Sequence, residues 1–552
     1  MWLLKYNKFI AIAALWIPLV LLGLSPQKER QAQERFEKVF RELLTRYVAE
    51  INPEKLSNHA ISSLLADLDP YSEYILKENE YRLDVLTKGQ YGGIGLKLGR
   101  QNDTLVVITP MAGSPAEQRG IRPGDRIIKI DSVWTRDLST HQAAQMVRGP
   151  AGEPVALLIK RYGVNEPLVF HLIREIIRVE DITYSGLVSG RVGYVKLASF
   201  SRYTAIHLEQ EIHRLQQSGM TAFILDLRGN PGGLLHAALE TADLFLPQNE
   251  MILETRGRLP SANKVYHTKR RPVLPETPMV VLMDGGSASA SEIVGGILQD
   301  LDRAVVLGSR TFGKGLVQTV YPVDEKAILK LTTAKYYLPS GRLIQKAVYG
   351  EGLIREDDDL VDSLDYLTRQ GRHVKGGGGI RPDVEVAPLL VDRYERQLWQ
   401  QGLFFQFAVQ YVNSHDDLIL PFHATDSEVE AFRDWLGDQG YEYATDFTNW
   451  LDKSLSLVDT TVSVSASIVD LLERARDLAS VMEQEAFDAN YDRIRLGIER
   501  EVAAVIGGTS ARFAAGMRED LVLEEALSLL RQPGAVTAIL HGETVARSVR
   551  AD

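Results

Sequence analysis

The sequence predicts a multidomain protein of mixed helix and sheet (α/β, with α+β character) and helical regions at both ends. The chain has 552 residues, which is more than one hydrophobic core usually serves. Short apolar runs, such as residues 222–225 and 278–284, end at glycine-rich turns that precede helical patterns. This alternation of strand and helix is typical of an α/β domain. In residues 393–552 apolar side chains recur at helical spacing, which favours a separate helical region.

The composition is that of an ordinary globular protein, and it disfavours several classes of function. The net charge of −11 argues against nucleic acid as a partner, because phosphate binding requires clustered lysine and arginine. The chain has no cysteine, which excludes disulfides, zinc-thiolate sites and a cysteine nucleophile. Its eleven histidines form neither a His-Glu-x-x-His nor a His-x-His pattern, so we expect no metal and no other cofactor.

Residues 1–27 are typical of an export signal. Lys5 and Lys8 precede a strongly apolar run at residues 9–24, which matches the charged and hydrophobic regions of a secretory signal. The run is near the minimum length for a membrane span, and residues 23–25 offer only a poor cleavage site. We expect an uncleaved anchor in the inner membrane, or alternatively a cleaved signal peptide. Either way we expect the protein in the bacterial periplasm or cell envelope.

Residues 28–88 are predicted to be helical. Their apolar side chains recur at i, i+3, i+4 and i+7, which predicts one wet face and one buried face. The residues on the apolar face are Phe36, Val39, Phe40, Leu43, Leu44, Tyr47 and Val48.

A serine-rich turn, residues 285–292 (GGSASASE), follows the apolar strand at 278–284 and precedes a predicted helix at 292–298. A helix N-terminus leaves backbone N–H groups that can stabilise an oxyanion. A second apolar run, residues 304–307, leads to the glycine-flanked Lys314. Because a desolvated lysine can take the proton of a serine hydroxyl, this layout fits a Ser-Lys hydrolase. The spacing alone fits equally well with small residues that pack a tight helix start.

A nucleotide-binding loop is a rival interpretation of the same region. Residues 308–314 fit the first seven positions of a phosphate-binding P-loop that follows a strand. Gly315 stands where that motif requires serine or threonine to hold Mg²⁺. The mismatch disfavours an NTPase.

Residues 287–300 and 308–318 closely resemble the carboxyl-terminal processing peptidases, also called tail-specific proteases. The resemblance implies a crotonase/Clp-protease-like core, with Ser289 as the nucleophile, Lys314 as the general base and Gln318 as the residue that orients the lysine. Gln318 lies four positions after Lys314, so on a strand the two side chains would share a face.

Residues 226–233 (DLRGNPGG) follow the strand at 222–225, and paired glycines allow a backbone amide to approach a ligand closely. By the same resemblance, the amide of Gly233, or less favourably that of Gly232, joins the amide of Ala290 in an oxyanion hole. Without the resemblance, an ordinary glycine-rich turn would be the better interpretation.

Residues 89–175 resemble a PDZ domain. The resemblance rests on a short turn, on the glycine- and proline-containing stretch at 112–125 and on the strand at 126–130. It implies that the turn forms a nest of backbone N–H groups for a peptide's terminal carboxylate, while the peptide adds a strand to the sheet. Helix residues 141–146 would line the side-chain pocket, and Arg148 would report occupancy to the protease. The turn consists of Gly93, Ile94, Gly95 and Leu96.

The protease core is predicted to span residues 176–392, because residues 380–383 resemble the closing motif of the family. Residues 393–552 carry no catalytic motif, and we expect a packing domain, with homo-oligomerisation as an alternative role. One amphipathic helix is expected at 521–530. Another is marked by Val429, Phe432, Trp435 and Leu436.

These features together predict an exported, membrane-associated serine endopeptidase. Its PDZ domain would capture the C-terminal tails of proteins, and the Ser289–Lys314 dyad would cleave them. A non-catalytic PDZ scaffold on an inactive protease fold is the alternative. His236, three residues after Gly233, is the alternative base.

Overall fold

The computed structural model describes most of the chain as two compact units. Among the described residues, one unit comprises residues 25–76 and 319–332, and the other comprises the rest. Residues 1–24, which carry the predicted signal, lie outside the described residues. The described residues are 25–76, 89–101, 103–348, 355–356, 364–387, 391–415, 417–457 and 465–543.

The first unit contains α2 (Ser25–Arg46), α3 (Pro53–Ala66) and β1 (Glu73–Leu76). Asn52 caps α3 by accepting a hydrogen bond from the Lys55 N–H. The prediction of helix over residues 28–88 is therefore right at α2 and α3 and wrong at residues 47–52 and at β1, and residues 77–88 lie outside the described residues. Pro70 disfavours helix in the residue before it, and β1 pairs antiparallel with residues 327–330.

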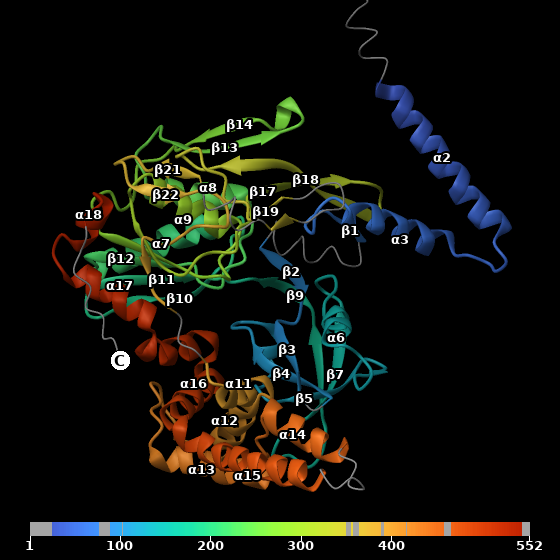
Figure 1. Ribbon diagram of the computed structural model, residues 1–552, viewed down its shortest axis with the longest axis vertical. Coiled ribbons are helices and arrows are strands. Elements are labelled where there is room, and N and C mark those ends of the chain that lie inside the picture. Colours follow the sequence, from blue (N-terminus) through green and yellow to red (C-terminus); the bar gives the residue numbers. More distant parts are fainter. Residues whose placement is uncertain are drawn as a thin grey trace, which may run out of the picture. The chain divides into compact units, whose positions relative to one another are not determined.

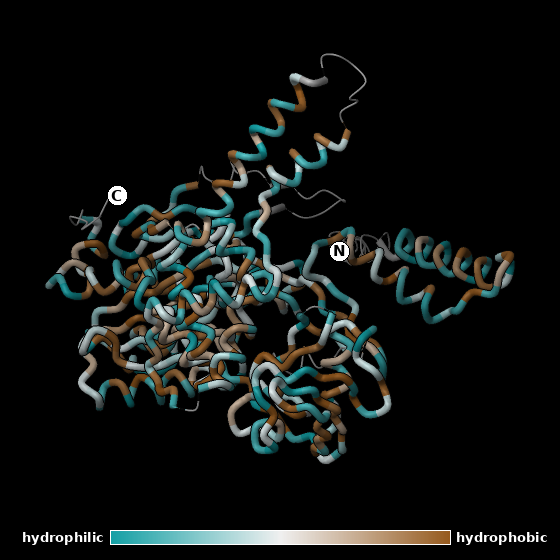
Figure 2. The backbone as a smooth tube through the Cα atoms, turned by 90° about the horizontal axis from the view of Figure 1, so that it is seen from below, coloured by the Kyte–Doolittle hydropathy of each residue, from teal (hydrophilic) through white to brown (hydrophobic). Residues whose placement is uncertain are grey.

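The apolar face of α2 differs from its prediction. The helix forms as the spacing predicts, and hydrophobic and hydrophilic residues alternate along it (Figure 2). Phe36, Val39 and Tyr47 are nevertheless exposed, and Val48 is 93% exposed. Periodicity determines which side chains share a face, but tertiary contacts determine whether that face is covered.

Within the second unit, residues 89–178 form a small β-rich module. Its main sheet has the order β3-β4-β5-β7-β8, with β6 paired to β5, and β2 pairs separately with β9. Its strands are β2 (Gln90–Gly93), β3 (Leu96–Gln101), β4 (Thr104–Pro110), β5 (Arg126–Ile130), β6 (Val133–Trp134), β7 (Pro154–Lys160), β8 (Leu168–Ile173) and β9 (Glu175–Arg178); its helices are α5 (Pro115–Gln118) and α6 (Thr140–Val147).

The central sheet of the second unit has the order β10-β11-β12-β15-β16-β23. β10 pairs antiparallel with β11, and the other neighbours are parallel. The strands are β10 (Ile182–Val188), β11 (Val192–Leu197), β12 (Ala222–Asp226), β15 (Met279–Met283), β16 (Val305–Gly308) and β23 (Val384–Glu385).

Helices cover both faces of this sheet (Figure 1). Alternate strand residues, such as Leu225 and Val281, join a core with α7 (Thr204–Gln217), α8 (Leu235–Asp243) and α9 (Ala290–Asp300). The intervening residues, such as Ile224 and Val280, join a second core on the opposite face. That face is covered by α17 (Leu521–Arg531) and α18 (Ala535–Leu540). The near-continuous apolar strands are thus explained by burial on both sides.

A further sheet contains β13 (Met251–Gly257), β14 (Lys264–His267), β17 (Leu316–Pro322) and β18 (Ala327–Tyr337). A 3₁₀ turn, η2 (Pro260–Ala262), lies between β13 and β14. The described residues also contain two short antiparallel pairs of strands: β19 (Ala347–Val348) with β20 (Arg355–Glu356), and β21 (Asp365–Leu367) with β22 (His373–Lys375).

The C-terminal region is helical, as its spacing predicts, but it divides into two packing groups. The earlier helices share their own core, which contains Leu398, Phe432 and Ile498. In contrast, α17 and α18 complete the core of the central sheet. The earlier helices are α11 (Arg393–Gln400), α12 (Leu403–Ser414), α13 (Asp426–Asp438), α14 (Asp446–Leu457), α15 (Ser465–Ala489) and α16 (Tyr491–Gly516), followed by the 3₁₀ turn η3 (Met517–Glu519).

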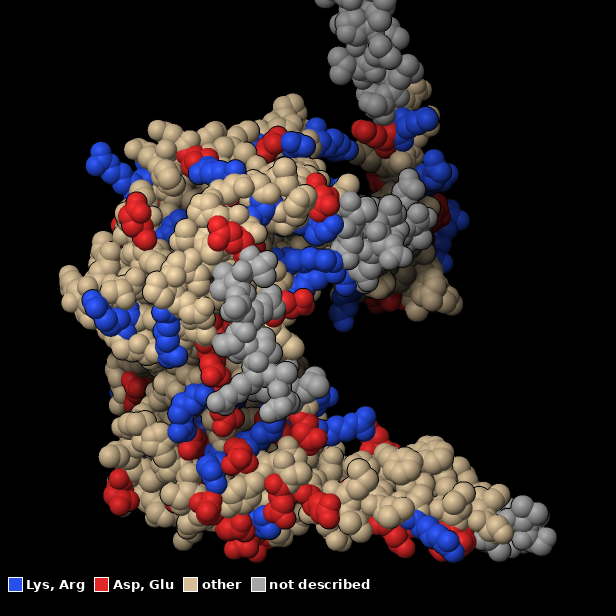
Figure 3. Space-filling view, turned by 60° about the vertical axis from the view of Figure 1, so that its left-hand side comes forward, with Lys and Arg blue, Asp and Glu red and all other residues tan. Residues whose placement is uncertain are grey.

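Charged side chains of both signs are interspersed over the face shown in Figure 3. Among the described helices, none has the length and apolar character needed to cross a membrane.

Candidate active site

The serine-rich turn joins the end of β15 to the start of α9. Ser289 is the N-cap of α9, with φ 55° and ψ −112°, and its side chain is half-buried. A positive φ is uncommon for a residue other than glycine, and such strain clusters at functional sites. Ala290 begins the helix directly after it. The turn therefore presents Ser289 at a helix N-terminus, as the sequence predicts.

The two flanking serines are used for structural contacts. The Ser287 hydroxyl donates to the Leu227 carbonyl at 2.9 Å, and the Ser291 hydroxyl donates to the Asn230 carbonyl at 2.8 Å. Both side chains are fully buried. Among the three serines, Ser289 is thus the one that is partly exposed.

Glu292 connects this turn to the lysine loop. Its carboxylate accepts hydrogen bonds from the Ser289 N–H at 2.8 Å, the Gly313 N–H at 2.7 Å and the Lys314 N–H at 2.9 Å. The Thr311 hydroxyl donates to it at 2.6 Å. Burial raises the pKa of Glu292 to about 7, although these donors oppose the shift. Sequence reasoning assigned no role to Glu292, although its Ser-x-x-Glu spacing is the signal of a capping box.

Tyr336 makes a second connection between the two segments. Its hydroxyl donates to the Lys314 carbonyl at 2.7 Å and lies 3.5 Å from the Ser289 carbonyl. The side chain is fully buried. The backbones of Ser289 and Lys314 therefore lie beside the same hydroxyl.

Lys314 is half-buried and lies just before β17, which carries the half-buried Gln318. A phosphate-binding loop leads from a strand into a helix. Here the strand β17 follows Lys314, so the structure contradicts the P-loop interpretation.

The glycine-rich loop at residues 226–233 packs against the serine turn. A Cβ atom on Gly232 would lie 2.8 Å from the Ala290 nitrogen and 2.9 Å from the Ser289 Cβ, so only glycine fits there. The Gly232 N–H donates to the Asn230 side chain at 2.9 Å. Gly233, with φ 154°, forms a parallel β-bridge with Phe200. The structure thus places Gly232 beside the first turn of α9, while the next residue, Gly233, lies against Phe200.

His236, the alternative base, lies on α8 with an exposed side chain. Its ring contacts Tyr266, with 6.5 Å between centroids.

The predicted carboxylate-binding turn lies between β2 and β3. Gly95 has φ +72°, and a Cβ there would lie 2.2 Å from the Ser114 Cβ. The Gly95 carbonyl accepts hydrogen bonds from the Met111 N–H at 2.8 Å and from the Ser114 hydroxyl at 3.2 Å. These bonds fix the Gly95 peptide within the predicted turn of residues 93–96.

The elements around this turn leave room for a bound peptide to add a strand to the sheet. Among the described strands, β3 is an edge strand of its sheet, and α6 packs against it. The predicted pocket residues 141–146 lie on α6. Arg148 follows α6 directly in the sequence, and its guanidinium lies over the Tyr91 ring, 5.4 Å from the ring centroid.

Comparisons with known proteins agree with this architecture. The family model of Peptidase family S41 matches residues 191–354, a PDZ domain model matches residues 106–161, and the model of the probable PDZ-protease C-terminal helical domain matches residues 394–530.

Three curated relatives are similar to the chain. The carboxy-terminal-processing protease of Bartonella bacilliformis is 41% identical over 315 residues, which cover 56% of this chain and 72% of the relative. The carboxyl-terminal-processing protease of Synechocystis is 37% identical, and the match covers 52% of this chain and 68% of the relative. The carboxy-terminal processing protease CtpA of Bacillus subtilis is 33% identical, and the match covers 69% of this chain and 80% of the relative. The chain is a serine-type peptidase that belongs to peptidase family S41, among the carboxy-terminal processing proteases.

Proposed function

We propose that this peptidase is an endopeptidase that captures protein C-termini on its PDZ domain and cleaves them with Ser289 as the nucleophile and Lys314 as the general base. The observation that carries the proposal is the shared attachment of the two residues. Glu292 and Tyr336 each bond to the backbone of both Ser289 and the lysine loop. Such shared anchors support a fixed geometry between a nucleophile and its base.

In the proposed reaction the neutral amine of Lys314 takes the proton from the Ser289 hydroxyl, whose oxygen attacks the scissile carbonyl. Gln318 orients the amine without adding charge. The amides of Ala290 and Gly233 stabilise the oxyanion. Gly233 is favoured over Gly232, because the Gly232 N–H already donates to Asn230. The protonated lysine then gives its proton to the leaving amine, and water hydrolyses the acyl-enzyme. The scheme uses no metal and no nucleotide.

We extend the proposal to the rest of the chain. The sheet flanked by α7 to α9 is arranged as in crotonase and Clp-protease folds, with the PDZ domain inserted beside it. Residues 9–24 anchor the protein in the inner membrane and place the peptidase in the periplasm or cell envelope. The C-terminal helices support assembly into a homo-oligomer.

The dyad is tested by incubating the purified full-length chain with an unstructured protein that ends in an apolar tail. We expect wild type to cleave it and Ser289→Ala to be inactive, with an unchanged melting temperature. Ser287→Ala is the matched control within the same turn and should remain active. Equal cleavage by wild type and Ser289→Ala would refute the dyad. Binding of the tail without cleavage by wild type would favour the inactive scaffold.

Tail recognition is tested separately with one peptide made in two forms, a free acid and a C-terminal amide. The amide lacks the charge that the amides of residues 93–96 are proposed to bind. Charge-assisted hydrogen bonds contribute about 1.5–3 kcal/mol, so we expect the amide to bind roughly ten- to a hundredfold more weakly. Equal affinities would show that this module recognises something other than a C-terminus.

A further inference from the structure

Arg228, in the glycine-rich loop, is held between two carboxylates from distant parts of the chain. Its guanidinium donates to both oxygens of Asp520, at 2.7 and 2.6 Å. It also donates to both oxygens of Asp226, at 2.7–3.1 Å. Asp226 is fully buried, and the Arg228 and Asp520 side chains are 16% and 17% exposed. Planar, bidentate pairing of this kind fixes orientation as well as charge.

The other polar side chains around Asp226 balance the charges of this cluster. Lys196 donates to Asp226 at 3.0 Å and to the Arg228 carbonyl at 2.5 Å. The Tyr194 hydroxyl also donates to Asp226. Two cations thus face two carboxylates. Burial alone would raise the pKa of Asp226, but Arg228 and Lys196 lower it to about 2.

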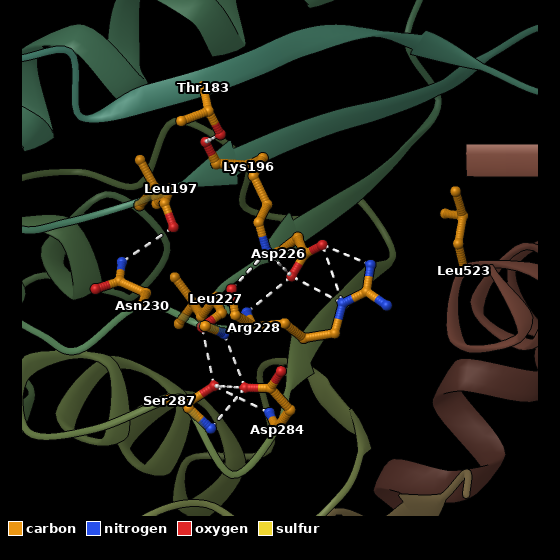
Figure 4. Close-up of polar contacts among 12 residues, drawn as sticks. Thr183, Lys196, Leu197, Asp226, Leu227, Arg228, Asn230, Asp284, Ser287 and Leu523 are labelled. Carbon is orange, nitrogen blue, oxygen red and sulfur yellow. Dashed lines mark hydrogen bonds and ion pairs between the residues drawn. The ribbon is translucent and has the colours of Figure 1, made fainter. Parts of the chain in front are cut away.

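The backbone that follows Arg228 is bonded to the serine turn. The Gly229 N–H donates to Asp284 at 2.8 Å. The Asn230 carbonyl accepts hydrogen bonds from the Ala288 N–H and from the Ser291 hydroxyl. Figure 4 shows the Arg228 side chain pointing away from Ser287 and toward the side of Leu523. The loop therefore has the nucleophile on one side and the C-terminal helices on the other.

The C-terminal region makes two contacts with this cluster. Asp520 is the N-cap of α17 and accepts a hydrogen bond from the Leu523 N–H at 3.0 Å. Phe513, on α16, packs on the rings of Tyr184 and Tyr194, and the Lys196 amine lies 5.8 Å from its centroid. Arg228 and Asp520 are almost three hundred positions apart in the sequence.

An open space adjoins the Arg228–Asp520 contact. A cavity of about 210 Å³ lies between the ends of β15 and β16 and the start of α17, and both residues line it. If Asp520 no longer held it, the Arg228 guanidinium would have room to turn into this cavity. The orientation of Arg228 therefore depends on Asp520 as well as on Asp226.

We propose that the C-terminal helical region controls the catalytic competence of the Ser289 site through Asp520, a positioning residue that fixes Arg228 and thereby the backbone of residues 228–233. The inference rests on the proposed oxyanion role of that loop. The protease domain is then incomplete without α17, and any partner or movement that displaces the start of α17 switches the site off.

The test uses Asp520→Asn in the full-length chain. Asparagine is as good an N-cap as aspartate, so α17 keeps its cap, but the amide cannot accept from both guanidinium N–H groups. We expect kcat on the apolar-tailed protein to fall by about tenfold or more, since small misplacements of catalytic groups cost that much, with KM within about twofold. We also expect faster hydrogen exchange at the backbone amides of Gly229, Asn230, Gly232 and Gly233. Asp520→Glu retains the carboxylate and should recover part of the loss.

Asp392→Asn is the matched control. Asp392 caps α11 by accepting from the Tyr394 N–H at 2.7 Å, and the same substitution there should leave kcat and loop exchange unchanged. A double-mutant cycle with Arg228→Lys isolates the pair. If Asp520 acts through Arg228, adding Asp520→Asn to Arg228→Lys should cause little further loss of kcat.

Two results would overturn the inference. One is a kcat or a loop exchange rate for Asp520→Asn that stays at the wild-type value, because the proposal requires both to change. The other is a double mutant in which the fold-losses of kcat caused by Asp520→Asn and by Arg228→Lys multiply, because the two residues would then act independently. Failure of the proposed function looks different: Ser289→Ala would then cleave like wild type. Loop exchange needs no turnover and tests the Asp520 contact in either case.

Discussion

The two loops that meet the Ser289 turn are attached to it in different ways. The glycine-rich loop, residues 226–233, is bonded to the turn through several residues, including Asp284, Ser287 and Ser291. The lysine loop, residues 311–315, is bonded to the turn and the start of α9 mainly through one carboxylate, that of Glu292. The Phe312 N–H, which donates to the Ser287 carbonyl, and the Tyr336 hydroxyl add further links. Distributed attachment tolerates single losses, whereas attachment mainly through one group makes the position of Lys314 depend strongly on that group.

The largest expected effect concerns the base itself. Lys314→Arg should lower kcat by about 10²–10⁴-fold, the usual contribution of general-base catalysis. Guanidinium keeps its proton in the working pH range, whereas a buried lysine amine can lose it. The activity of wild type should also rise with pH and persist in chelators.

Lys335→Arg is the control for this substitution, because Lys335 is an exposed residue of β18. It should cleave like wild type. Normal cleavage by Lys314→Arg would rule out the dyad and return attention to His236.

The next effect tests the attachment of the lysine loop through Glu292. Glu292→Gln replaces one acceptor oxygen by an NH₂ group, which cannot accept. Depending on its orientation, the NH₂ group faces either the Ser289 and Lys314 N–H groups or the Gly313 N–H, so backbone anchors of the turn or of the lysine loop are lost. We expect kcat to fall by about 10²-fold, as for a misplaced catalytic group, and the melting temperature to fall. Thr311→Val removes one donor to Glu292 and the acceptor of the Ile380 N–H, but it leaves the backbone bonds to Glu292 in place, so it should have a much smaller effect on kcat. Equal effects of the two substitutions would contradict attachment through Glu292.

The sequence predicts the parts of the site that are encoded locally. The end of β15, the start of α9 and the position of Lys314 follow from short apolar runs and their glycines. Burial of Glu292 and the bridge made by Tyr336 depend on segments that meet only in the folded chain. The Arg228–Asp520 pair is beyond any local pattern for the same reason.

The same limit explains the errors outside the site. The spacing of α2 predicts its apolar face but not its exposure. The predicted single region at 393–552 is divided, because α17 and α18 complete the core of the central sheet. Helical spacing identifies these helices, but it does not identify the surface against which they pack.

The pH dependence of stability should distinguish the two loops, because their carboxyl groups are shifted in opposite directions. The pKa of Asp226 is lowered to about 2. Its contribution to stability is therefore present above its ordinary pKa of 3.8 and is lost as the pH falls toward 2. The pKa of Glu292 is raised to about 7. Its contribution is greatest below its ordinary pKa of 4.5 and is lost as the pH rises to 7.

Denaturant unfolding at several pH values checks this contrast. Between pH 4 and pH 2, wild type should lose about 2 kcal/mol more than Asp226→Asn, at about 1.4 kcal/mol for each unit of pKa shift. Between pH 5 and pH 7, wild type should lose stability relative to Glu292→Gln. Parallel curves for wild type and both variants would show that neither carboxyl controls its loop.

The smallest effect tests whether attachment of the glycine-rich loop is distributed. Ser291→Ala removes the hydroxyl that bonds to the Asn230 carbonyl, but that carbonyl also accepts from the Ala288 N–H at 3.0 Å. No buried acceptor is left unpaired, so the free energy of unfolding should fall by only about 0.5–1.5 kcal/mol. Because the remaining bonds still hold the loop, kcat should fall less than tenfold. Urea unfolding and cleavage of the apolar-tailed protein measure the two quantities. If Ser291→Ala were as inactive as Ser289→Ala, then either the position of the loop depends on this one bond, or Ser291 is the nucleophile. Labelling with a serine-reactive acylating probe, followed by identification of the modified residue, distinguishes these two explanations.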